Sequence, residues 1–134
     1  MFSARLLVQG GDSSAARAGI VAIEGLSGTP LYAWTARYAS TGEIRAAVNA
    51  KSSLPGFSSS SLPVWVRVER RGNALYSAAS NDGISWSERT NVSVSSPSLQ
   101  VGLALSSGQN NSLVSAWFDQ VSIVGGQTAA RSVR

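Results

Sequence analysis

The stretch of residues 63–86 most constrains the fold, because its pattern is that of two short strands joined by tight turns. Three valines alternate along its first half with polar or aromatic residues, among them Trp65 and Arg67. An alternation of this kind is typical of a strand with one buried face. Gly72-Asn73 and Asp82-Gly83 are turn formers. The stretch therefore predicts an antiparallel hairpin that has one face in a core and one face open to water or a partner.

The same alternation recurs along the whole chain and predicts about nine strands with no helix. Besides the central hairpin, the expected strands cover residues 2–8, 18–24, 30–38, 43–49, 85–94, 99–105 and 113–124. The apolar phase shifts between Phe118 and Val121, which predicts a β-bulge near Asp119 and Gln120. Short strands separated by turns indicate a two-layer all-β sandwich or barrel. We expect one domain over residues 1–126 and a flexible tail over 127–134.

The absence of cysteine and histidine limits the chemistry of the chain. Disulfides are excluded, zinc loses its usual ligands, and histidine-based proton transfer is impossible. Glycoside hydrolysis needs a pair of carboxylates, and the seven acidic residues do not form the Glu-x-Asp-x-x-Glu motif of laminarinase-like enzymes. We therefore expect no enzyme activity and no cofactor. A calcium site at Asp82 or Asp119 stays open as an alternative.

The charge of +4 comes almost entirely from arginines that are scattered along the chain. No run of basic residues approaches a basic arm, so we expect no nucleic-acid partner. No segment approaches the ~18 apolar residues of a membrane span, so we expect no membrane insertion. The apolar stretch after Met1 is too short for the core of a signal peptide. We expect that the chain is made without a leader or is a processed domain.

Several motifs occur in a characteristic order along the chain: Ala16-Arg17-Ala18-Gly19-Ile20, Trp65-Val66-Arg67-Val68, Arg71-Gly72-Asn73, Ser80-Asn81-Asp82-Gly83-Ile84-Ser85-Trp86, Val101-Gly102-Leu103-Ala104 and Ala116-Trp117-Phe118-Asp119-Gln120-Val121. Together they resemble the concanavalin A-like, LamG-like jelly-roll modules of bacterial secreted multidomain proteins, over roughly residues 3–124. The resemblance implies a two-sheet antiparallel jelly-roll sandwich that binds sugars or surfaces, outside the cell or on a particle. Such modules usually begin with further strands. The resemblance thus implies that the first strands are missing here or that another subunit covers the edge.

The aromatic residues supply the candidate binding site. Trp34, Trp65, Trp86 and Trp117 are candidate stacking platforms, because the apolar face of an indole suits the C–H face of a sugar ring. A role as core or inter-strand anchors competes with this interpretation, most strongly for Trp86 and Trp117. Trp65 shares a strand face with Arg67, which is typical of a binding patch. The candidate ligand-binding residues are therefore Trp65 and Arg67, with Trp34 and Tyr38 on a second aromatic face.

Two functions stay open. The first is a non-catalytic module that recognises carbohydrate or a cell or particle surface through an aromatic-plus-Arg sheet face. The second is a structural assembly subunit, such as a virion decoration or surface-filament protein, that forms homo-oligomers through its sheet edges. The expected partners are thus a glycan or surface ligand, and either further copies of the chain or a parent multidomain chain.

Overall fold

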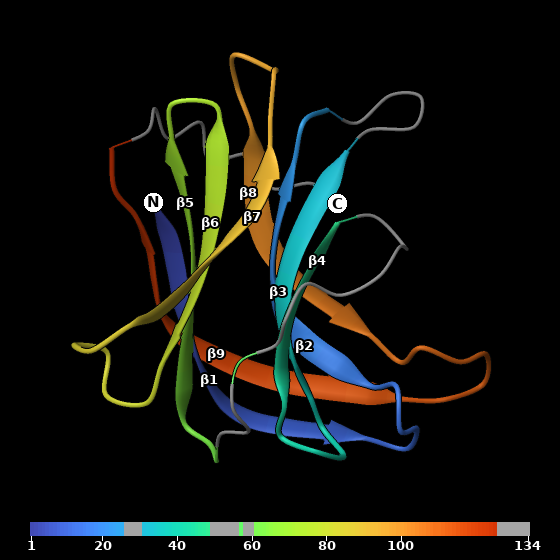
Figure 1. The fold of residues 1–134 in the computed structure, drawn as a ribbon. Helices are drawn as coiled ribbons and strands as arrows, with labels where there is room; N and C mark the ends of the chain where they lie inside the picture. Colours follow the sequence, from blue (N-terminus) through green and yellow to red (C-terminus); the bar gives the residue numbers. More distant parts are fainter. Residues whose placement is uncertain (26–30, 49–56, 58–60, 126–134) are drawn as a thin grey trace.

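The computed structural model describes residues 1–25, 31–48, 57 and 61–125, which form two antiparallel sheets without a helix (Figure 1). The nine strands are β1 (Phe2–Gly11), β2 (Arg17–Ile23), β3 (Tyr32–Tyr38), β4 (Ile44–Val48), β5 (Val64–Arg71), β6 (Ala74–Ser80), β7 (Ser87–Ser93), β8 (Gln100–Ser106) and β9 (Val114–Ile123). The prediction of an all-β fold with two antiparallel sheets is confirmed. The expected tail 127–134 lies outside the described residues.

The two sheets pack as the layers of a sandwich. One sheet has the strand order β7-β6-β5-β1-β9 and the other has the order β4-β3-β2-β8. Contacts between the layers join β1 to β2, β4 to β7 and β8 to β9. In Figure 1, β1 and β9 run side by side across the lower part of the view and bend upward on its left. One side of the sandwich is thus bounded by β8 and β9, and the opposite side by β4 and β7.

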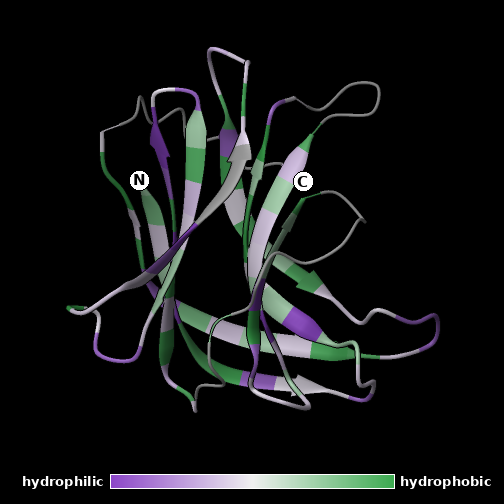
Figure 2. Ribbon diagram, in the orientation of Figure 1, coloured by the Kyte–Doolittle hydropathy of each residue, from purple (hydrophilic) through white to green (hydrophobic). Residues whose placement is uncertain are grey.

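Alternate residues of the inner strands form the core, as the two-residue period predicts. Figure 2 shows the same alternation of apolar and polar positions along the ribbons. The central hairpin contributes its three valines, and Gly72 at its turn has a positive φ of 59°. Phe57, which lies outside the strands, is also buried in this core. The main core residues are Phe2, Ala4, Leu6, Ala18, Ile20, Ala22, Ile44, Ala46, Val64, Val66 and Val68.

A β-bulge interrupts the pairing of β1 with β9. Ser3 pairs with Ser122 and Arg5 pairs with Asp119, so β9 contains one residue more than β1 between these pairs. Gln120 lies at this position with a positive φ of 48°. The predicted bulge near Asp119 and Gln120 is confirmed. It turns the side chain of Gln120 toward the candidate site described below.

A second irregularity lies between Leu6 and Val8 of β1, and the sequence pattern did not predict it. Leu6 is buried, whereas Val8 faces solvent beside Trp117. The next residue, Gln9, reaches the other sheet. Its Nε2 donates to the backbone oxygen of Arg37 at 2.7 Å, and Arg37 Nη1 donates to its Oε1 at 3.0 Å. Between Leu6 and Val8, β1 contains one residue more than β9 does. This extra residue changes which side chains of β1 point inward, and it places the polar pair of Gln9 and Arg37 between the sheets.

Candidate functional site

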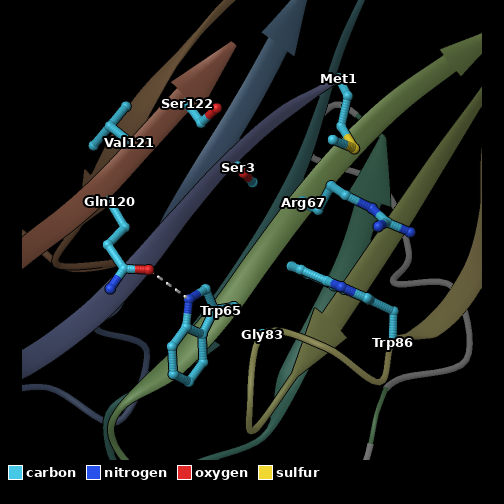
Figure 3. Close-up of a pocket in the computed structure, with 9 residues that line it drawn as sticks. All are labelled: Met1, Ser3, Trp65, Arg67, Gly83, Trp86, Gln120, Val121 and Ser122. Carbon is cyan, nitrogen blue, oxygen red and sulfur yellow. Dashed lines mark hydrogen bonds between the residues drawn. The ribbon is translucent and has the colours of Figure 1, made fainter. Parts of the chain in front are cut away.

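A shallow hollow of about 440 Å³ lies on the outer face of the five-stranded sheet (Figure 3). It is lined by side chains from β5, from the start of the chain, from β9 and from the connection between β6 and β7. The sequence-predicted residues Trp65 and Arg67 both line it. They point outward because they alternate along β5 with the buried valines. Trp86, Gln120 and Ser3 complete much of the wall.

Trp65 is held in place from several directions. Its Nε1 donates a hydrogen bond to Gln120 Oε1 at 3.3 Å, which Figure 3 shows as a dashed line. The guanidinium carbon of Arg5 lies 5.4 Å from the ring centre. Gly83 lies against the indole, and a Cβ at that position would come within 3.1 Å of Trp65 Cε2. The tryptophan is thus oriented before any ligand arrives, which lowers the entropy cost of binding.

Arg67 and Trp86 stack on each other in the hollow (Figure 3). The guanidinium carbon lies 4.3 Å from the centre of the Trp86 ring, in the range of a cation–π interaction. Arg67 Nη2 donates to Glu88 Oε2 at 3.2 Å, and its buried Nε has no acceptor among the described residues. A guanidinium carries five N–H donors. Trp86 therefore makes an inter-strand contact, as expected of an anchor, and also lines the candidate site.

Arg71 joins the two carboxylates beside the hollow. It donates to Glu69 at 2.8 Å and to Glu88 at 2.6 Å. These hydrogen bonds from Arg71 hold the pKa of both carboxyl groups below the usual glutamate value. Both side chains are therefore ionised at neutral pH. Glu88 in turn fixes the position of Arg67.

Asp82 shapes the connection between β6 and β7 that carries Gly83 and Trp86. Its Oδ1 accepts hydrogen bonds from the backbone N–H groups of Ile84 and Ser85, both at 2.8 Å. The same oxygen accepts a side-chain hydrogen bond from Ser80 Oγ at 2.9 Å. These bonds hold the pKa of Asp82 below the usual aspartate value. The carboxylate is thus engaged in holding the loop.

The calcium alternative concerned Asp82 and Asp119. Asp119 forms an ion pair with Arg5, whose Nε donates to Oδ1 at 2.6 Å. Within the described parts of the chain, no three acidic, histidine or cysteine side chains form a group that could hold a metal ion. Each of the two carboxylates accepts hydrogen bonds from protein donors, Asp82 from its own loop and Asp119 from Arg5.

Acidification tests the role of Asp82. Because its pKa is lower in the folded than in the unfolded chain, the unfolded chain binds more protons as the pH falls below about 4. The stabilisation from Asp82 is present above that range and is lost as the pH falls through the folded-state pKa. We expect Asp82→Asn to lose less stability than the wild type between about pH 7 and about pH 3 in urea unfolding.

The matched control for this prediction is Asp12→Asn, which removes a carboxylate at an exposed position outside this loop. The control measures how far the removal of a carboxylate elsewhere changes the pH dependence of stability. An equal loss of stability in the wild type and in Asp82→Asn would show that the loop hydrogen bonds do not depend on the charge.

Trp34 and Tyr38 lie on the outer face of the other sheet, and the structure does not bring them near the hollow. Their ring centres are 6.4 Å apart, with an interplanar angle of 52°. Arg17 lies 5.1 Å from the Trp34 ring and Arg45 lies 4.6 Å from the Tyr38 ring. The four candidate ligand-binding residues therefore belong to two surfaces on opposite sides of the sandwich.

The alternative in which Trp117 is a core residue is wrong. Its side chain is 70% exposed, and it pairs with exposed Val8 on the outer face. The next residue, Phe118, packs against the core instead. Successive side chains of a strand point to opposite faces, so only one of two adjacent aromatic residues can be buried. Because Phe118 packs against the core, this rule places Trp117 on the outer face.

Comparison with family models, with curated proteins and with solved structures gives no match to this chain. The described residues contain no helix that is long and apolar enough to span a membrane. The structure supports the two-sheet architecture that the motifs imply. The resemblance to the concanavalin A-like modules stays a prediction from the sequence.

Proposed function

We propose that this chain is a non-catalytic binding module that recognises carbohydrate, free or on a surface, through the hollow on its five-stranded sheet. The observation that carries the proposal is the grouping of Trp65, Arg67 and Trp86 around that hollow. An indole face offers a stacking surface to the C–H face of a sugar. The N–H groups of Arg67 and the amide of Gln120 offer hydrogen bonds to hydroxyl or carboxylate oxygens. The volume of about 440 Å³ suits a small ligand or one unit of a polymer.

The charges beside the hollow support binding without catalysis. Glycosidases need one carboxyl group whose raised pKa keeps it protonated. Glu69 and Glu88 have lowered pKa values because Arg71 binds both. Neither side chain is thus suited to donate a proton at neutral pH. We further propose a jelly-roll module that acts outside the cell or on a particle surface, as the sequence motifs imply.

Replacing Trp65 by alanine tests the proposal. We expect at least a tenfold loss of affinity, because an aromatic side chain at the centre of a site contributes about 1.4 kcal/mol or more. Affinity gel electrophoresis in a panel of soluble polysaccharides, followed by a glycan array, measures the effect. Trp34→Ala is the matched control, since it removes a half-buried tryptophan from the opposite face.

Two outcomes would contradict the proposed site. If no polysaccharide or glycan retains the wild-type chain, a carbohydrate-binding function is excluded. If Trp34→Ala loses binding while Trp65→Ala keeps it, the ligand lies on the outer face of the four-stranded sheet instead. Both variants keep the buried core residues unchanged, so circular dichroism is expected to show an intact fold.

A second candidate function is that of a structural assembly subunit, and the character of one sheet edge favours it. Strand β8 is an edge strand without charged residues. Uncharged edges are prone to pair with a strand of another chain. A binding module and an assembly subunit are compatible, because β8 and the hollow belong to different sheets.

A further inference from the structure

The sandwich has four edge strands, namely β4, β7, β8 and β9, and three of them carry features that hinder pairing with another chain. Strand β4 is only five residues long and contains Arg45. Strand β7 contains Glu88 and Arg89, and its pairing with β6 has a register shift. Strand β9 is irregular at two places in its pairing with β1, one of them at Gln120. Charges and bulges are the usual means by which proteins protect sheet edges.

Strand β8 has none of these features. It contains no charged residue, and it pairs with β2 over seven residues without a register shift. No described strand pairs with its other side. Its backbone therefore presents a regular row of N–H and C=O groups along that edge.

Apolar side chains follow this edge on the inner face of the sheet. Val101, Leu103 and Leu105 pair with the core residues of β2 and so point to the same side. Nevertheless, Leu103 is 45% exposed and Leu105 is 51% exposed. Large apolar side chains that point inward yet stay exposed indicate a core that is incomplete at this side.

We propose that a second copy of this chain pairs with β8 in antiparallel orientation and completes the core at this edge. The two four-stranded sheets then join into one continuous sheet across a two-fold axis. The axis passes beside Leu103, which lies opposite Leu103 of the second copy. Val101 then lies opposite Leu105 of the second copy, and Gly102 opposite its Ala104. Such an isologous contact is closed, so the assembly ends at a dimer.

The sequence of β8 argues for a second copy rather than for an unrelated strand. Its inner row, Val101-x-Leu103-x-Leu105, is apolar at every position and so stays apolar when it is read in the opposite direction. Apolar residues then face apolar residues at every inner position, as cross-strand pairing requires. Two copies of a chain with net charge +4 repel each other, and β8 is the edge strand at which no charged side chain adds to that repulsion.

The dimer does not rest on the carbohydrate site. The hollow lies on the five-stranded sheet, so both hollows stay accessible in the dimer. Two hollows on one dimer raise the apparent affinity for a surface that carries many copies of a ligand. We expect Trp65→Ala to remain dimeric, which separates failure of the binding proposal from failure of this one.

Sedimentation equilibrium at concentrations up to about 100 µM tests the dimer. The wild type is expected to show twice the chain mass of 13.9 kDa. Leu103→Lys is expected to show a single chain mass, because it removes an apolar side chain of the contact and places two like charges directly opposite each other at the axis. Leu103 is 45% exposed in the single chain, so a lysine there can reach solvent and we expect the fold to be kept. Ile84→Lys, at an exposed position with the same added charge, is the control and is expected to stay dimeric.

A cysteine at the axis tests the register. The chain has no cysteine of its own, so a single substitution reports one contact. In the proposed dimer the two Cα atoms at Leu103 are about 4.5–5.5 Å apart, within the range of a disulfide. Leu103→Cys is expected to form a covalent dimer on mild oxidation, seen on a non-reducing gel, whereas Ile84→Cys is not. A monomeric wild type at about 100 µM, a dimeric Leu103→Lys, or Leu103→Cys without a cross-link would overturn the proposal.

Discussion

Replacing Gly19 by alanine is expected to lower the free energy of unfolding by at least about 3 kcal/mol. Gly19 lies in the middle of β2, between Ala36 of β3 and Ala104 of β8. A Cβ at this position would lie 2.0 Å from the backbone oxygen of Thr35 and 2.6 Å from Ala36 Cα. Both neighbours are backbone atoms and cannot rotate away. The alanine therefore forces β2 and β3 apart, and with them the pairing at the centre of the four-stranded sheet.

Urea unfolding measures this loss, and Gly102→Ala on the neighbouring strand is the control. A Cβ at Gly102 meets nothing within 4 Å. We expect that variant to match the wild type or to gain up to about 1 kcal/mol, because alanine lowers the entropy of the unfolded chain. If the free energy of unfolding of Gly19→Ala lies within about 0.5 kcal/mol of the wild-type value, β2 and β3 do not approach as closely as the structure shows.

Replacing Leu6 by alanine is expected to lower the free energy of unfolding by about 2–5 kcal/mol. Leu6 is fully buried, and its strand lies between β5 and β9, where it pairs with Val64 and Phe118. Removing its side chain leaves a cavity in the middle of the core. The spread of the expected value reflects how far the neighbouring side chains can fill that cavity.

Leu113→Ala is the control for this second prediction, since it makes the same chemical change at a position that is 76% exposed. We expect its free energy of unfolding to lie within about 0.5 kcal/mol of the wild type. Equal losses in the two leucine variants, measured in the same urea titration, would contradict the burial of Leu6 and the position of β1 in the sandwich.

The irregularities of β1 and β9 show which features of the fold can be predicted from the sequence of a single strand. The bulge at Gln120 was predictable, because the apolar phase of its own strand shifts there. The irregularity between Leu6 and Val8 was not, because the apolar run of β1 continues through it without a change of pattern. Only the pairing with β9, more than a hundred residues further along, shows that Val8 faces solvent.

The candidate site, too, could be predicted from the sequence only in part. The alternation along β5 correctly predicts that Trp65 and Arg67 share an outward face. It does not predict that Trp86 stacks on Arg67 or that Gln120 binds Trp65, because these residues reach the hollow from other parts of the chain. Nor does alternation show that Trp34 lies on the opposite side of the sandwich from Trp65.

By itself, the sequence determined the approximate positions of the strands, the buried face of β5, the turn at Gly72 and the absence of histidine and cysteine chemistry. These features follow from a period of two residues and from composition, which are properties of short segments. The tertiary structure alone decided the order of the strands, the grouping of Trp65, Arg67 and Trp86, and the exposure of Leu103 at the β8 edge. These depend on which distant strands pair and on where each sheet ends, and hydrogen bonds between distant strands leave no mark on the local pattern.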